Sequence, residues 1–221
     1  MAEKVLLAWS GGKDSAITLY EIQQRPEYQV ASLLTTLTAH YDRVSMHGVR
    51  RALLERQAES LSLPLHEIFI SKEATNEEYA SKMQAALTDF QKAGVSSVVF
   101  GDIHLADVRK YREDNLSQVG MKAIFPIWGR DTAELTRSFI DLGFKAIVTC
   151  VDSKVLDKTF AGRIIDKSFL AQLPANVDPC GENGEFHSFV FDGPIFNGRI
   201  QYTVGQILLR DSFYFCDLIP A

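Results

Sequence analysis

A short glycine-rich loop near the start of the chain is the feature that most constrains the fold. It follows an apolar run at residues 5–9, typical of a buried strand, and precedes a helical pattern from about residue 15 to residue 24. A strand, a glycine loop and a helix in this order gather backbone N–H groups and the positive end of a helix dipole at one point. The glycines permit positive φ angles and let an anion approach the backbone. The unit therefore predicts a phosphate or pyrophosphate site built by Ser10, Gly11, Gly12, Lys13, Asp14 and Ser15.

Two better-known phosphate loops do not fit this segment. A Walker A loop needs a glycine where this chain has Leu7, and a serine or threonine where it has Asp14. The glycine spacing of the dinucleotide fingerprint is absent as well. Asp14 itself leaves two interpretations open. Its carboxylate either binds Mg²⁺ beside a polyphosphate, or it only stabilises the positive end of the following helix.

Further apolar runs indicate an α/β fold. They lie at residues 30–37, 65–70, 98–100 and 123–125, with a shorter one at 146–148, and amphipathic helical patterns separate them. Continuous apolar strands that alternate with helices are typical of a parallel sheet covered on both faces. We therefore expect a doubly wound parallel sheet.

Two of the expected helices have recognisable ends. Thr75 and Glu78 form a capping-box pattern, in which each side chain can bond a backbone N–H at the helix start, and Gly94 is placed to end that helix. Asp131 and Glu134 repeat the start signal before a second helix. These signals fix the positions of two helices that flank the expected strands.

The sequence changes character after about residue 150. We expect a helical stretch from about 156 to 173, a glycine-rich segment at 178–187, and short strands at 188–191 and 213–216. Because no linker or low-complexity tract intervenes, this part should pack closely on the first. The pattern predicts a smaller C-terminal α+β domain.

The expected domain boundary also divides the charge. Residues 1–130, with the phosphate loop, carry 15 basic and 16 acidic residues, and residues 131–221 carry 8 and 12, so their net charges are −1 and −4. Affinity for nucleic acid rests largely on clustered lysine and arginine. A chain with a net charge of −5 is therefore not expected to have a broad nucleic-acid-binding face.

The cysteines point to a reducing compartment, and the hydropathy pattern shows no membrane-spanning segment. Cys150, Cys180 and Cys216 are odd in number and form no CxxC pair, so neither a disulfide framework nor a zinc ribbon is indicated. No apolar run approaches the ~18 residues that a membrane span needs. The first residues show neither a basic leader nor a small-residue cleavage site. We expect a cytoplasmic protein without a membrane partner.

The glycine-rich segment at 178–187 contains Glu182, Glu185 and His187. On composition it is either a solvated turn or a rigid loop that holds two carboxylates and an imidazole near a cation or an attacking amine. No residues with zinc-ligand spacing accompany it. Structural or surface roles are expected for the isolated histidines His40, His47, His66 and His104.

Taken together, these motifs resemble a known family over nearly the whole chain. The loop at 10–15 matches the SGGxDS signature of the PP-loop ATP pyrophosphatases. Gly101-Asp102-Ile103 after the fourth expected strand, the stretch 109–120 followed by Phe125-Pro126-Ile127-Trp128, and residues 178–192 are similar to the diphthine–ammonia ligase-like, diphthamide-synthesis-related members. The resemblance implies the PP-loop, adenine nucleotide alpha hydrolase-like fold.

The resemblance also implies an activity, ATP-dependent and AMP-forming amide synthesis. A substrate carboxylate attacks the α-phosphate of ATP and releases pyrophosphate, and ammonia then displaces AMP. Lys13 and the loop amides would stabilise the leaving pyrophosphate, with Mg²⁺ at Asp14. Gly101 and Asp102 are expected near the adenosine or the α-phosphate.

The same resemblance assigns the acceptor side of the reaction to the C-terminal motif. Glu182, Glu185 and His187 would bind ammonium, remove its proton or hold the substrate. The expected partners are ATP, ammonium and a carboxylate on a protein side chain or a small molecule. A homodimer is left open.

Two other functions and one segment stay open at this point. A tRNA-modifying PP-loop enzyme would need a basic RNA face or paired catalytic cysteines, and a nucleotide-binding sensor would bind ATP without turnover. Residues 109–113 only partly match the family pattern. They are either a phosphate contact or part of an exposed amphipathic helix.

Overall fold

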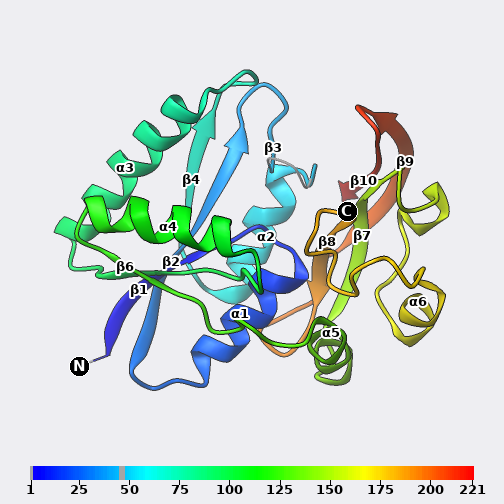
Figure 1. Cartoon of the computed structure of the whole chain (residues 1–221), viewed down its shortest axis with the longest axis horizontal. Coiled ribbons are helices and arrows are strands. Elements are labelled where there is room, and N and C mark those ends of the chain that lie inside the picture. The colour runs from blue at the N-terminus through cyan, green and yellow to red at the C-terminus, as the bar shows by residue number, and fades with distance from the viewer. Residues whose placement is uncertain (1, 45–47) are drawn as a thin grey trace.

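A computed structural model describes residues 2–44 and 48–221, so the prediction for His47 lies outside the described residues. The chain forms two sheets flanked by helices (Figure 1). The first sheet has six strands and contains the N-terminal part of the chain: β1 (Glu3–Ala8), β2 (Tyr28–Thr38), β3 (Arg43–Val44), β4 (Leu65–Ile70), β5 (Ser97–Val99) and β6 (Lys122–Ile124).

The first sheet is doubly wound, which confirms the expected fold class. All pairings among β4, β2, β1, β5 and β6 are parallel, and the strands lie side by side in that order. The chain runs outward from β1 to β2 and β4, and then returns to place β5 on the other edge of β1. The short β3 pairs antiparallel with the end of β2. The winding direction therefore reverses between β1 and β5, where open α/β sheets bind ligands beyond the strand ends.

Four helices cover the two faces of this sheet: α1 (Lys13–Gln23), α2 (Arg51–Leu61), α3 (Asn76–Lys92) and α4 (Ala106–Gln118). Side chains along β1 alternate between the faces, because successive residues of a strand point to opposite sides. Val5 and Leu7 pack in one core with α1 and α2, whereas Leu6 packs in the other core with Leu87 of α3 and Leu116 of α4. The continuous apolar run in the sequence is thus explained by burial on both faces.

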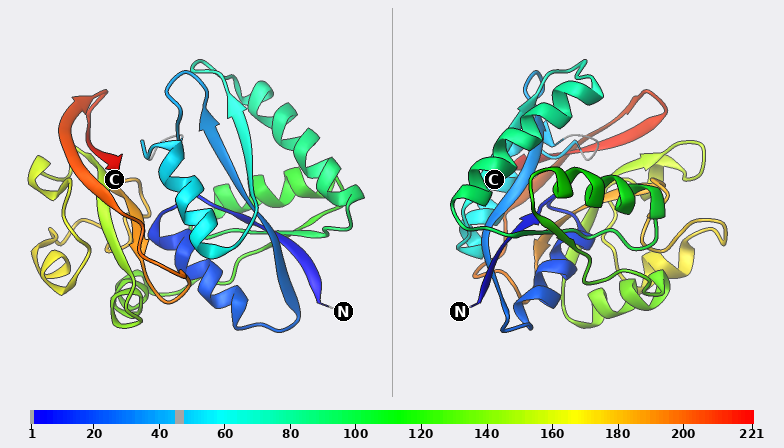
Figure 2. Two further views of the ribbon diagram at one scale, coloured as in Figure 1. Left: turned by 180° about the vertical axis from the view of Figure 1, so that it is seen from behind. Right: turned by 60° about the vertical axis from the view of Figure 1, so that its left-hand side comes forward.

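The second sheet is antiparallel and has the strand order β8 (Phe186–Asp192), β7 (Lys145–Asp152), β10 (Phe213–Pro220), β9 (Tyr202–Arg210). The same part of the chain contains α5 (Thr132–Asp141) and α6 (Lys167–Gln172). Its composition is therefore α+β, as expected. One apolar core joins it to the first sheet, with α1 and α2 between the two sheets (Figure 2). A backbone bond from Val190 N–H to the Gly11 carbonyl, 2.9 Å, ties β8 directly to the glycine loop. The predicted division at residue 130 stays a prediction.

The side-chain caps at the starts of both predicted helices are confirmed. Glu78 N–H donates to Thr75 Oγ1 at 3.2 Å, and Glu134 N–H donates to Asp131 Oδ1 at 2.8 Å. The reciprocal half of the first capping box does not form, because the Glu78 carboxylate accepts the backbone N–H and the hydroxyl of Ser71 instead. Gly94 ends its helix with a φ of +85°.

The helix expected from about 156 to 173 is wrong for most of its length. The structure has a short 3₁₀ turn, η1 (Lys158–Phe160), and the single helix α6, with an extended segment between them. Gly162 N–H donates to the Val148 carbonyl, and Val148 N–H donates to the Arg163 carbonyl, both at 2.8 Å. Backbone pairing with β7, the preceding strand, therefore overrides the local helical pattern in this segment.

Other expectations concern burial. Cys150, Cys180 and Cys216 are free thiols and all are buried, as predicted. Within the described ranges, no helix combines the length and the apolar character that a bilayer crossing requires. A helix was expected between the second and third apolar runs, where α2 lies, but without bounds; β3 and β9 were not among the expected strands.

Candidate functional site

A cavity of about 790 Å³ opens at the carboxyl ends of β1 and β5, where the winding reverses. Its size lies in the usual range for small-molecule sites. It brings together most of the residues singled out in the sequence, from the glycine loop, from the end of β5 and from the C-terminal motif. The lining includes Ser10, Gly12, Lys13, Asp14, Ser15, Gly101, Asp102, Glu182, His187 and Ser188.

The backbone requires glycine at the first position of the loop and leaves little space at the second. Gly11 has a φ of +78°, and a Cβ there would lie 2.7 Å from the Gln57 side-chain oxygen. A Cβ on Gly12 would lie 3.1 Å from the Ser188 carbonyl oxygen. The loop is closed by Ser15, whose hydroxyl donates to the Gly12 carbonyl at 2.9 Å. The chain therefore passes tightly between α2 and β8 before α1 begins.

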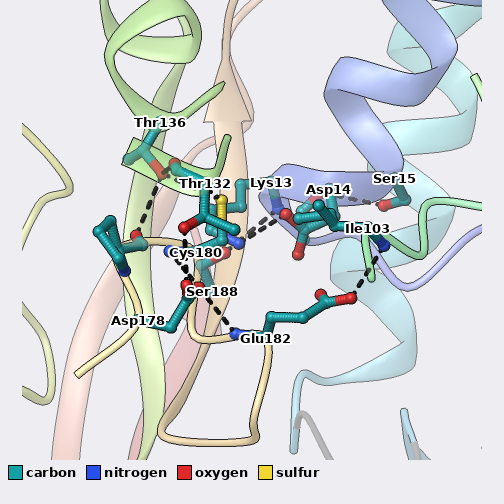
Figure 3. A network of polar contacts seen from close by, with 12 residues as sticks. Lys13, Asp14, Ser15, Ile103, Thr132, Thr136, Asp178, Cys180, Glu182 and Ser188 are labelled. Atoms are coloured by element: carbon teal, nitrogen blue, oxygen red, sulfur yellow. Dashed lines mark hydrogen bonds and ion pairs between the residues drawn. The ribbon is translucent and has the colours of Figure 1, made fainter. Parts of the chain in front are cut away.

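Lys13 is a buried cation at the start of α1, 3% exposed. Its Nζ lies 2.6 Å from Asp14 Oδ1 (Figure 3). The same atom lies 5.8 Å from the centre of the Phe186 ring. Burial alone would lower the pKa of Lys13, but the charge of Asp14 and nearby acidic groups outweigh it and raise the pKa above its usual range. Lys13 thus stays protonated at the floor of the cavity.

Asp14 is the carboxylate of the loop that faces the cavity, and its side chain is 34% exposed. Within residues 2–44 and 48–221, no group of three His, Cys, Asp or Glu side chains could hold a metal ion by itself. A cation at Asp14 would need further oxygen ligands from a substrate or from water.

The end of β5 supplies Gly101 and Asp102. A Cβ on Gly101 would lie 3.0 Å from the backbone carbonyl of Asp14, so only glycine lets β5 approach the first turn of α1 this closely. Asp102 pairs with Arg112 of α4: Nη2 donates to Oδ1 at 3.1 Å, and Nε lies 2.7 Å from Oδ2 in a bent contact. The Arg112 guanidinium also stacks 4.4 Å above the Phe100 ring.

Residues 109–113, whose role the sequence left open, belong to α4 and include two partly exposed arginines. Arg112 holds Asp102, and Arg109 lies 4.9 Å from the centre of the Phe125 ring and 4.7 Å from that of Trp128. Both cations have partners within the protein. Arg112 also lines the cavity, so a phosphate contact by this stretch stays a prediction.

The C-terminal motif is anchored by Asp178. Its Oδ1 accepts the backbone N–H groups of Cys180 at 2.8 Å and Glu182 at 3.2 Å, and its Oδ2 accepts the hydroxyl of Thr132 at 2.7 Å (Figure 3). Burial raises the pKa of the Cys180 thiol to about 11, which keeps it neutral beside Lys13. The motif is therefore a loop held by hydrogen bonds from its own backbone and from Thr132.

Glu182 crosses from this loop to the first half of the chain. Its Oε1 accepts the N–H groups of Ile103 at 2.8 Å and His104 at 3.2 Å, just after β5. Burial raises the pKa of Glu182, the charge of Asp14 raises it further, and the bonds from the two amides only partly oppose this. Glu182 is a carboxylate with an increased tendency to take up a proton, placed on the wall of the cavity.

Glu185 and His187 lie differently. The Glu185 carboxylate is buried within its own loop, where it accepts the N–H of Asp178 at 3.0 Å and both the backbone N–H and the side-chain amide of Asn183. It does not line the cavity, whereas His187 does. The structure thus brings Glu182 and His187 to the site and leaves Glu185 behind it. A catalytic role for Glu185 stays a prediction.

Two of the other histidines have aromatic neighbours. The rings of His66 and Phe90 meet edge-on with their centres 5.0 Å apart, and those of His40 and Tyr41 with their centres 4.8 Å apart. Packing of this kind fits the structural or surface roles that were expected. His104 takes part in the site only through its backbone N–H.

Sequence reasoning missed Gln57, Asp178 and Ser188. Ser188 Oγ accepts the backbone N–H of Lys13 at 3.2 Å across 175 positions of sequence. Gln57 is fully buried, on the same face of α2 as Leu53, Leu54, Ala58 and Leu61. A single polar residue in an otherwise apolar helix face was the available signal, because a buried amide must find partners.

Comparisons with known proteins cover both halves of the chain. The family described as Diphthamide synthase N-terminal domain matches residues 3–123, and the family described as Diphthamide synthase C-terminal domain matches residues 131–218. The U34-tRNA thiolase NcsA from Methanococcus maripaludis, solved with its 4Fe–4S cluster, is 15% identical, with a TM-score of 0.39, over 64% of this chain and 57% of that chain. That likeness carries no functional argument.

Curated relatives are similar along most of the chain. The diphthine–ammonia ligase of Schizosaccharomyces pombe is 25% identical over 97% of this chain, which spans 38% of the length of that relative. The diphthine–ammonia ligase of Homo sapiens is 23% identical over 92% of this chain and 84% of its own length, and that of Danio rerio is 25% identical over 92% and 88%. Since family matches to both halves cover nearly all its residues, the chain belongs to the diphthamide synthase family.

Proposed function

We propose that this chain is an ATP-dependent, AMP-forming carbon–nitrogen ligase that joins ammonia to a carboxylate. The observation that carries the proposal is the meeting of two motifs on one cavity at the switch point of the sheet. The glycine loop and Lys13 come from one half of the chain, and Glu182 and His187 come from the other. Membership of the diphthamide synthase family, with relatives named diphthine–ammonia ligase, supports the same chemistry.

The glycine loop would bind the β- and γ-phosphates of ATP. Gly12 and Ser10 line the cavity, α1 directs its positive end there, and Lys13 stays charged although it is buried. Donors that are already oriented stabilise developing negative charge without reorganising during the reaction. Their placement favours departure of pyrophosphate, as the bond between the α-phosphorus and its bridging oxygen breaks.

Mg²⁺ would be held by Asp14 together with the phosphates. Magnesium typically takes one or two carboxylates and completes its shell with phosphate oxygens and water, so a single partly exposed carboxylate at the loop fits it. When bound, the ion would supply charge neutralisation between the phosphates. Lys13 holds one Asp14 oxygen at 2.6 Å and so fixes the orientation of that carboxylate.

Glu182 and His187 would act on the acceptor side. The substrate carboxylate forms a bond to the α-phosphorus, giving an acyl-adenylate. Ammonia then attacks the acyl carbon, AMP leaves, and one proton must be removed from the nitrogen. Glu182 is suited to accept that proton as a general base, because burial raises the pKa of its carboxyl. We propose that Glu185 supports this step indirectly, by holding the loop through Asp178 and Asn183.

The alternatives find less support in the site. Burial raises the pKa of Cys150 to about 12 and that of Cys180 to about 11, and Cys216 is also buried, so the three thiols make poor nucleophiles for a thiolase. Free thiols in such surroundings agree with the expected cytoplasmic compartment.

Product analysis tests the proposal. The protein is incubated with ATP, Mg²⁺, ammonium and a panel of carboxylates, and the nucleotides and amides are identified. AMP, pyrophosphate and an amide are expected in equal amounts. ADP and phosphate would contradict the proposal, and tight ATP binding without turnover would indicate a sensor.

A further inference from the structure

The side-chain amide of Gln57 lies at the junction of the three segments that shape the glycine loop. Its Oε1 accepts the indole N–H of Trp9 at 2.9 Å, and its Nε2 donates to the carbonyls of Gly11 at 3.0 Å and Val190 at 2.6 Å. The indole can only donate and the carbonyls can only accept, which fixes the orientation of the amide. One buried side chain thus joins the end of β1, the loop and β8.

The Gly11 carbonyl is held from two directions. It accepts Gln57 Nε2 at 3.0 Å and the backbone N–H of Val190 at 2.9 Å, on the core side of the loop. In a planar trans peptide the carbonyl and the following N–H point in opposite directions. The Gly12 N–H therefore points away from the core, and it meets Ser10 Oγ at 3.2 Å; Ser10 and Gly12 both line the cavity.

This peptide needs an external restraint because it joins two glycines. Glycine adopts positive and negative φ angles about equally well, so a flip of the Gly11–Gly12 peptide has little local cost. A flipped peptide would direct a carbonyl oxygen, instead of an N–H, at a bound phosphate. The two bonds to the Gly11 carbonyl select the orientation that presents the donor.

We propose that Gln57 is a positioning residue for nucleotide binding, which locks the Gly11–Gly12 peptide so that the Gly12 N–H faces the phosphates of ATP. The proposal rests on the phosphate-binding role of the loop proposed above. Gln57 does not touch the nucleotide. It acts only by orienting the Gly11–Gly12 peptide. Because Gln57 also bonds the Val190 carbonyl, this orientation depends on a residue in the C-terminal half of the chain.

Substitutions of Gln57 test the proposal, with Ser60 as the matched control. Ser60 lies on the same helix and also bonds the C-terminal half, but its hydroxyl contacts Gly198 rather than the loop. Binding of ATP–Mg²⁺ is measured by titration calorimetry, and the melting temperature of each variant is measured alongside. Gln57→Leu should weaken binding about tenfold or more, since an oriented donor to a charged group is lost. Ser60→Ala should bind as the wild type does.

Gln57→Glu supplies a readout that simple loss of packing would not give. Burial beside the carbonyls of Gly11 and Val190 raises the pKa of the introduced carboxyl, and only its protonated form has an O–H, which can donate to one of the two carbonyls. The affinity deficit relative to the wild type at the same pH should therefore shrink between about pH 8 and about pH 6. If Gln57→Leu does not fold, the pH dependence of ATP binding by Gln57→Glu is sufficient to test the proposal.

Each result bears on the proposal. Wild-type affinity in the Gln57 variants, an equal loss in Ser60→Ala, or a deficit in Gln57→Glu that does not change with pH would overturn it. A wild-type protein that binds no ATP would instead overturn the proposed function, because the loop would then have no phosphate to meet.

Discussion

Two glycine-rich loops meet at the cavity, and they use their residues in opposite ways. The loop at 10–15 turns the Gly11 carbonyl into the core, where Gln57 and Val190 bond it, and presents the Gly12 N–H and the buried cation of Lys13 on the cavity side. The loop at 178–187 turns its acids inward, where Asp178 and Glu185 accept N–H groups of its own backbone. Only part of its negative charge reaches the cavity. A count of acidic residues in the sequence therefore overstates the acidity of the site.

The largest effect should come from the cation of the first loop. Lys13→Ala should lower kcat by about 10²–10³-fold, because a preorganised charge at the leaving pyrophosphate is lost. Steady-state kinetics with ATP in excess measure this, and Lys4→Ala, an exposed lysine on β1, serves as the control. Equal rates for Lys13→Ala and the wild type would place the phosphates elsewhere.

Substitutions of the two glutamates in the second loop should have different effects. Glu182→Gln should bind ATP normally and make amide about tenfold more slowly. In the wild type, the acid limb of the pH profile of amide synthesis should lie above the range of an ordinary carboxyl, because the pKa of Glu182 is raised. The variant should lose this limb.

Glu185→Gln should act first on the loop. Its amide cannot accept all the N–H bonds that the carboxylate accepts, so the free energy of unfolding should fall by about 1–3 kcal/mol, as seen by urea denaturation. Amide synthesis should fall with it while the pH profile keeps its acid limb. A lost acid limb at full stability would show that Glu185, rather than Glu182, handles the proton.

The smallest effect concerns a second contact between the halves, outside the loops. Asp217 of β10 accepts bonds from Arg50 and Arg43, at 2.7 and 2.9 Å. The bond from Arg50 and the charges of both arginines hold the pKa of Asp217 at about 2, against some burial. Asp217→Asn should lower the free energy of unfolding by about 1 kcal/mol at neutral pH, because the pair is partly exposed.

The pH dependence of this contact has a definite sign. A lowered pKa in the folded protein stabilises it above the unfolded value, about 3.9, and this contribution disappears as the pH falls toward 2. Wild type and Asp217→Asn should converge in that window in urea unfolding. Asp211→Asn, at the exposed turn between β9 and β10, is the control. A difference that persists at low pH would mean that the contact acts by shape and not by charge.

Local signals explain what the sequence could predict. The strand before the glycine loop, the caps at Thr75 and Asp131 and the alternation of strands with helices depend on residues close together in the chain. The pairing of residues 162–165 with β7 joins two segments across an intervening turn, and the bonds from Gln57 to the loop and β8 join segments 46 and 133 positions apart. No local pattern specifies such partners. The division of roles between Glu182 and Glu185 likewise depends on which carboxylate the folded loop turns inward.

An isotope experiment tests the central claim, that a carboxylate and not water attacks the α-phosphate of ATP. The carboxylate that supports turnover is labelled with ¹⁸O, and the AMP formed with Mg²⁺ and ammonium is examined by mass spectrometry. Adenylation predicts AMP that carries one ¹⁸O from the carboxylate, in step with amide formation. Unlabelled AMP in ordinary water would show simple hydrolysis and contradict the account.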